Sequence, residues 1–252
     1  MPGFISHTVM ARDVYNEINR KCSLEYILTY SLGGDLCKYA KCRYDSHHKD
    51  MDKFIYNMAD YIKDNNLLDD KEVMGVLYGH ICHYIMDSII HPLVRKMDKE
   101  CLNNKKNHTL IEEYYDTYLV KIKYGVSKQK YAKERLLNAK MKKKISEMID
   151  YVYMETYNTN KVSKYYKFNL FLYRLLKMIY RLFGNSIVDI ILGVNRFIKD
   201  NNNIDLFNDN NTVKYKDYLG NRCDDSLIIL YNESVLEACE YIKNVDRYLT
   251  KN

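Results

Sequence analysis

The chain has 252 residues, and 47% of them are hydrophobic, which is enough to bury a sizeable core. It contains only two prolines and nine glycines, so it lacks the many turn residues that a β-rich fold needs. The net charge of +6 comes from lysine-rich segments such as residues 142–144. This charge is compatible with an anionic phospholipid or nucleic acid partner, but solvated helix faces are its ordinary explanation.

Apolar residues recur mostly at intervals of three and four along the chain, which predicts an all-α fold, a multi-helix bundle in a single domain over residues 1–252. We expect helices at residues 8–20, 24–31, 50–64, 70–98, 106–123, 127–158, 165–198 and 225–249. Residues 199–224 are rich in Asn and Asp and are expected to form a long surface loop. All seven histidines lie at or before position 108, so residues 1–115 are expected to hold the site and residues 116–252 to complete the core.

The sequence does not predict a transmembrane helix or a secretory signal. Its most apolar segment, from Asn169, is interrupted by Arg174, Lys177, Arg181 and Asp189. A buried helix pair is the main interpretation of that segment, and an amphipathic face that contacts a membrane is the alternative. The N-terminus lacks a basic region followed by an apolar run, so we expect a cytoplasmic protein unless a leader has been removed. Seven cysteines without a CxxC pair fit a reducing compartment.

The segment 79–92, GHICHYIMDSIIHP, concentrates three histidines and an aspartate in an apolar stretch. A helix turns by about 100° per residue, which places His80, His83, Asp87 and His91 within about 80° of one another, on one face. Cys82 points to the opposite side and reads as a buried small residue. The polar stripe therefore faces inward or into a cleft.

Further nitrogen and oxygen donors lie on either side of this segment. His108 and Glu112 are four residues apart, so on a helix both side chains lie on one face and can bind one cation. Upstream are His7, Asp35 in SLGGDL and the doublet His47–His48. Imidazole and carboxylate without thiolate is the ligand set of a catalytic zinc, and the donors are numerous enough for two or three ions.

Each of these pairs has an ordinary interpretation as a hydrogen-bonded pair, and a polar network or an oligomer interface is the alternative to a metal site. Burying three histidines and an aspartate on one helix face without partners would destabilise the fold by roughly several kcal/mol. Metal ligation is the simplest way to satisfy them, so we favour a metal site.

The residues resemble those of the zinc-dependent phospholipase C proteins, bacterial all-helical enzymes that share their fold with P1/S1-type nucleases. The resemblance rests on HYIMDSIIHP, HTLIE, the early histidine in MPGFISHTVMAR, GGD and HHKDMDKF. It covers about the first 115 residues specifically. The chain departs from the family in three ways: only six residues precede His7, GGD stands where the family often has GPD, and Asp87 and His91 are only four residues apart.

The resemblance implies a set of zinc ligands. Asp35, His47, His83 and Asp87 would bind one zinc, His91, His108 and Glu112 a second, and His7 with a bridging Asp87 a third. His48 is the alternative to His47. His80 has no clear role in the family, and we expect it to support a ligand through a hydrogen bond.

The resemblance also implies a reaction, the attack of a zinc-activated water on phosphorus. Asp35 would orient or deprotonate that water, or act only as a ligand. A phospholipid would give diacylglycerol and a phosphorylated headgroup, with peripheral membrane contact and no obligate protein partner. The rival hypotheses are a single-strand nuclease or 3′-nucleotidase, which needs an aromatic platform for bases, and a non-catalytic metal-binding helical protein. Nucleic acid is the less favoured substrate.

Overall fold

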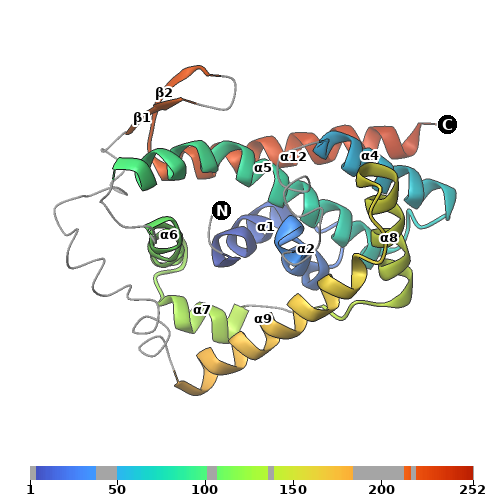
Figure 1. Ribbon diagram of the computed structural model, residues 1–252, viewed down its shortest axis with the longest axis horizontal. Coiled ribbons are helices and arrows are strands. Elements are labelled where there is room, and N and C mark those ends of the chain that lie inside the picture. The colour runs from blue at the N-terminus through green and yellow to red at the C-terminus, as the bar shows by residue number, and fades with distance from the viewer. Residues whose placement is uncertain are drawn as a thin grey trace.

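The computed structural model describes residues 4–37, 50–100, 107–135, 139–183, 213–216 and 220–251. In these ranges the chain forms nine α-helices, one 3-10 helix and one β-hairpin (Figure 1), which confirms the all-α prediction. The elements are α1 (Phe4–Glu17), α2 (Leu24–Tyr30), the 3-10 helix η1 (Gly33–Cys37), α4 (Met51–Asp64), α5 (Lys71–Glu100), α6 (Asn107–Tyr124), α7 (Lys128–Arg135), α8 (Lys143–Tyr157), α9 (Ser163–Phe183) and α12 (Leu227–Thr250), with strands β1 (Val213–Lys216) and β2 (Arg222–Asp225).

Helix α5 is the central element, and it packs against α2 on one side and α12 on another. Two glycines allow the approach of α2. A Cβ atom at Gly75 would lie 2.7 Å from the Cβ of Tyr26, and one at Gly79 would lie 2.7 Å from the backbone carbon of Tyr30. Side chains at these positions would push the two helices apart, so Gly75 and Gly79 allow α2 to lie close to α5.

The stretch Lys71–Met97 of α5 is the one part of the described chain long and apolar enough to cross a membrane. Most of it is buried inside the protein, as expected for the core helix of a bundle. Its histidines and aspartate therefore lie in the interior.

The helix predicted at 127–158 is wrong, because α7 and α8 are separate helices. Between them, tertiary contacts occupy the backbone groups that a continuous helix would use. The amide of Ala139 donates to Thr29 Oγ1 (2.7 Å), and its carbonyl accepts from Arg174 (2.9 Å). Likewise, the carbonyl of Lys140 accepts from the Tyr26 hydroxyl at 3.1 Å.

The predicted loop at 199–224 is also partly wrong, because it contains strand β1 and most of β2. The antiparallel register places Lys214 directly opposite Asp224, and opposite charges in this position stabilise a hairpin. Gly220 lies between the strands with φ +86°, a turn conformation that glycine adopts without strain. The remainder of that segment, and residues 184–198 of the predicted long helix, lie outside the described residues.

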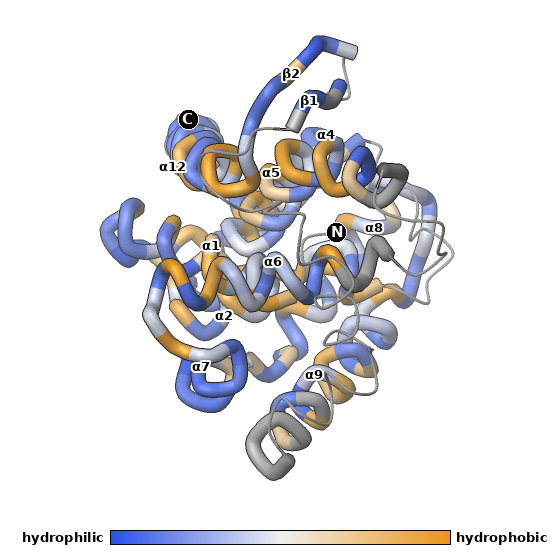
Figure 2. Tube along the Cα trace, turned by 90° about the vertical axis from the view of Figure 1, so that its left-hand side faces the viewer, coloured by the Kyte–Doolittle hydropathy of each residue, from blue (hydrophilic) through white to orange (hydrophobic). Residues whose placement is uncertain are grey.

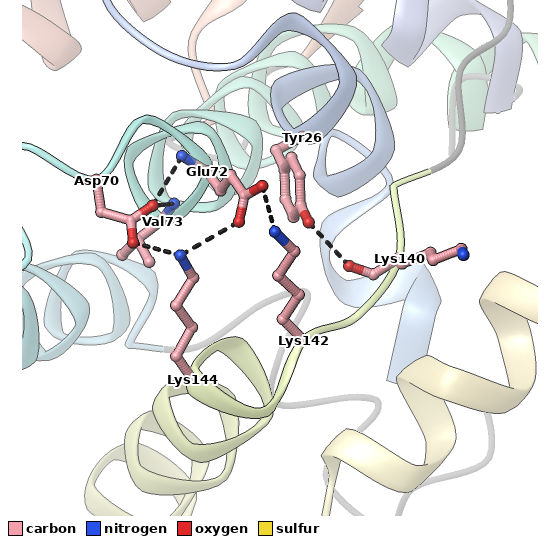
Figure 3. Close-up of polar contacts among 7 residues, drawn as sticks. All are labelled: Tyr26, Asp70, Glu72, Val73, Lys140, Lys142 and Lys144. Atoms are coloured by element: carbon pink, nitrogen blue, oxygen red, sulfur yellow. Dashed lines mark hydrogen bonds and ion pairs between the residues drawn. The ribbon is translucent and has the colours of Figure 1, made fainter.

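The lysine run at 142–144 is not simply a solvated face. Figure 3 shows that two of its lysines join the start of α8 to the start of α5. Lys142 Nζ lies 2.6 Å from Glu72, and Lys144 Nζ lies 3.2 Å from Glu72 and also binds Asp70. The hydrogen bond from Lys142 is the largest influence that lowers the pKa of Glu72. Lys142 and Lys144 therefore form ion pairs that hold the start of α8 against the start of α5.

Candidate metal centre

The structure brings three predicted ligands together from two helices. His7 lies on α1, and His83 and Asp87 lie one turn apart on α5. His7 Nε2 is 3.3 Å from Asp87 Oδ1, and His83 Nε2 is 3.6 Å from Asp87 Oδ2. The two imidazole rings lie 4.6 Å apart between centroids. In the described ranges this trio is the group of candidate ligands whose donor atoms all lie within 4.8 Å of one another.

The chemistry of this trio fits a zinc ion. All three side chains are buried, and neither ring nitrogen of His7 makes a hydrogen bond to the described part of the chain. Leaving such a nitrogen unsatisfied costs about 1–3 kcal/mol, which binding to a cation would offset. Two imidazoles and a carboxylate are also ligands that zinc prefers. Asp87 has one oxygen toward each histidine, so its carboxylate could serve as a ligand on both sides.

The backbone around η1 holds His83 in position. His83 Nδ1 lies 3.1 Å from the carbonyl of Ser31, which fixes the ring and leaves Nε2 toward Asp87. Gly33 lies against the other side: a Cβ there would be 2.3 Å from the Cγ of His83. Gly33 also has φ +40°, a conformation strained for other residues. The SLGGDL motif therefore supports the histidine as well as supplying Asp35.

Asp35 lies in η1, two residues after Gly33, and only 7% of its surface is exposed. Its carboxylate is not a member of the compact trio. The carbonyl of the next residue, Leu36, accepts a hydrogen bond from Asn169 of α9 at 2.9 Å. Helix α9 therefore anchors the segment that carries Gly33 and Asp35.

The other predicted ligands are more dispersed or lie outside the described residues. His91 is buried on α5, one turn beyond Asp87 and next to Pro92. Glu112 is half-buried on α6, a helix that packs against α5. His108 also lies on α6, but its side chain is not among those described, and His47 and His48 fall outside the described residues. A second metal site between α5 and α6 stays a prediction.

The hydrogen-bond contacts of His80 are with residues outside the trio. Its Nδ1 is 2.9 Å from the carbonyl of Val76, and its Nε2 is 3.0 Å from the Tyr166 hydroxyl, which in turn lies 2.9 Å from the Tyr153 hydroxyl. Its ring packs 5.5 Å from that of Phe54. These contacts place His80 in a buried tyrosine network rather than in hydrogen-bond contact with a member of the trio.

Replacing His80 with phenylalanine is expected to retain bound zinc and to flatten the acid dependence of stability. Burial lowers the pKa of His80 to about 4, although its contact with the Val76 carbonyl opposes this. The unfolded chain, with a histidine pKa of about 6.5, binds the proton first. Stability contributed by the neutral ring is therefore complete above that pH and falls as the pH drops toward 4.

Urea unfolding of the zinc-free proteins measures this effect. Between pH 7.5 and 5 the wild type should lose about 2 kcal/mol more than His80→Phe, since all other titrating groups are common to both. An equal loss in both proteins, or a zinc content that falls in the variant, would contradict the role of His80 described above.

Asp116 is a buried acid that the sequence analysis missed. Its carboxylate accepts hydrogen bonds from the amide of Ser6 at 2.8 Å, the amide of Ile5 at 3.2 Å and the Ser6 hydroxyl. Burial, followed by the charge of Glu113, raises its pKa, which the hydrogen bonds of Ser6 oppose. A carboxylate at the start of a helix satisfies free amides, so Asp116 fixes the first turn of α1, next to His7. Its partners lie 110 and 111 residues away in the chain, so no local pattern could have indicated this contact.

Comparison with known proteins bears on the identity of this site. A family model described as zinc dependent phospholipase C matches residues 6–168, more than half of the chain. The matched range contains all the predicted ligands, which are His7, Asp35, His47, His83, Asp87, His91, His108 and Glu112. Neither the comparison with curated proteins nor that with solved structures gave a match. Together with the all-α fold and the buried trio, the family match shows that the chain belongs to the zinc-dependent phospholipase C family.

Proposed function

We propose that the protein is a zinc-dependent phospholipase C that hydrolyses glycerophospholipids to diacylglycerol and a phosphorylated headgroup. The observation that supports this most is the buried meeting of His7, His83 and Asp87 within the range matched by the family. When bound, zinc lowers the pKa of a coordinated water from about 15.7 toward about 7 and neutralises charge on phosphoryl oxygens. Two or three ions would use the full donor set.

The protein's own groups would hold and orient the reactants. His7 and His83 would supply neutral ring nitrogens, with the His83 tautomer set by its contact with the carbonyl of Ser31, to which Nδ1 can donate. Asp87 would offer one carboxylate oxygen on the side of His7 and the other on the side of His83. Asp35, on the segment that packs on His83, would orient the attacking water or take its proton. No serine or cysteine nucleophile is needed.

The test is zinc analysis of the purified chain followed by three assays with and without a chelator. The substrates are p-nitrophenylphosphorylcholine, a short-chain phosphatidylcholine and single-stranded DNA. We expect chelator-sensitive cleavage of the choline compounds, with diacylglycerol as the lipid product. Cleavage of DNA alone would replace the proposal with a nuclease, and bound zinc without any hydrolysis would replace it with a non-catalytic metal protein.

A further inference from the structure

The outer face of α9 exposes an unusual group of large apolar side chains. The exposed fractions are 50% for Phe168, 59% for Phe171, 39% for Leu175 and 49% for Met178. Their spacing of three, four and three residues places them on one side of the helix. A stripe of this kind exposed to water usually marks a surface that contacts a partner or a lipid.

The charge of α9 indicates which partner fits that face. The helix sequence contains five basic residues and no acidic residue. Lys164 and Lys167 are exposed near the first of the apolar residues. Arg174, farther along, donates to the carbonyl of Ala139. A basic helix with exposed phenylalanine and leucine is typical of one that lies in the interface of an anionic bilayer. The positive charge complements anionic headgroups, and the apolar side chains fit the acyl boundary beneath them.

The opposite face of α9 is fixed to the body of the protein. Tyr166 and Leu170 are buried there, and Asn169 donates to the carbonyl of Leu36 in η1. The ring of Tyr173 lies 5.7 Å from that of Phe4, in the first turn of α1. In Figure 1, α9 runs along one edge of the molecule, and Figure 2 shows it extending away from the body. These contacts fix which side of α9 faces the protein, so the apolar stripe faces outward.

These contacts also relate the stripe to the metal centre. Helix α9 lies against η1, which holds Asp35, and against the start of α1, which holds His7. A helix with its side chains is about 10 Å across. A bilayer lying on the outer face of α9 would thus be about one helix diameter from the segments that present two of the predicted site residues.

From this arrangement we propose that the outer face of α9 docks the protein on anionic phospholipid bilayers. The proposal rests on the proposed function in one respect, since it makes this face the route by which a lipid hydrolase reaches its substrate. The occupant is a lipid surface with negative headgroups. The apolar side chains enter the acyl boundary while Lys164 and Lys167 face the headgroups.

Co-sedimentation of the full zinc-loaded chain with vesicles tests the docking, separately from catalysis. Vesicles of phosphatidylcholine with about 30% phosphatidylserine should bind the chain, and pure phosphatidylcholine should bind it more weakly. The double variant Phe168→Ser/Phe171→Ser should bind at least about tenfold more weakly. Lys164→Gln/Lys167→Gln should lose roughly tenfold or more, and added salt should reproduce that loss.

A matched control is available on another helix. Leu236 on α12 is 71% exposed, so Leu236→Ser also removes an exposed apolar side chain, and it should leave vesicle binding unchanged. The phenylalanine variant should hydrolyse a monomeric short-chain phospholipid at the wild-type rate but intact vesicles more slowly. Far-ultraviolet circular dichroism confirms that each variant is folded.

Three results would overturn the docking proposal: a wild-type chain that ignores anionic vesicles, an α9 variant that binds them as the wild type does, or light scattering that shows the phenylalanine variant converting a dimer to a monomer. The last result would mean that a second copy covers the face. Failure of the proposed function looks different, because vesicle binding through α9 would persist while no phospholipid is cleaved.

Discussion

Replacing Asp87 with asparagine is expected to lower zinc affinity by on the order of 100-fold or more and to abolish hydrolysis. Asp87 has one oxygen 3.3 Å from His7 and the other 3.6 Å from His83. Asparagine has nearly the same shape, but it removes the negative charge and turns one of those oxygens into an NH2 donor. The variant therefore removes the shared ligand without opening a cavity in α5.

Zinc content after dialysis and the rate of phospholipid hydrolysis measure this prediction together. The matched control is Asp70→Asn, the same chemical change at the start of the same helix, where asparagine also caps well. That variant loses its bond to Lys144 but should keep zinc and activity. If Asp87→Asn kept full zinc and full activity, Asp87 would not be a ligand. Lost activity with full zinc would assign Asp87 a role in orienting substrate.

Helix positions could be predicted from the sequence where the pattern is local. The predicted 50–64 and 70–98 lie within two residues of α4 and α5, because apolar spacing in these segments matches one buried face. The break between α7 and α8 could not be predicted in this way. There the amide and carbonyl of Ala139 are taken by Thr29 and Arg174, which are 110 and 35 residues away in the chain. Periodicity carries no information about such contacts.

The candidate site shows the same division between local and distant information. The one-face spacing of His83 and Asp87 follows from helix geometry, and the structure has them one turn apart. The meeting of His7 with them depends on how α1 packs on α5, for which the family resemblance was the guide. His80 shares the predicted face with His83, yet it contacts Tyr166, because a stripe spanning about 80° can face two environments.

Substitution of alanine for Gly33 is expected to disrupt the metal centre while every predicted ligand is retained. The added Cβ would lie 2.3 Å from both Cγ and Cδ2 of His83 and 2.6 Å from its Cβ. The last of these atoms is tied to the backbone of α5, so the side chain cannot simply rotate away. Either η1 or the imidazole must move, and a ligand displaced by about 1 Å loses productive geometry. We expect a loss of zinc affinity of about tenfold or more and slower hydrolysis.

Gly125→Ala separates this contact from backbone strain. Gly125 also has a positive φ, +64°, but a Cβ there meets nothing within 4 Å. Both variants should lose about 1 kcal/mol of stability through the unfavourable backbone conformation. Gly33→Ala should lose more, and it alone should release zinc, as measured by urea unfolding and by competition with a chromophoric chelator. Equal zinc affinity in the two variants would show that η1 yields readily and does not position His83.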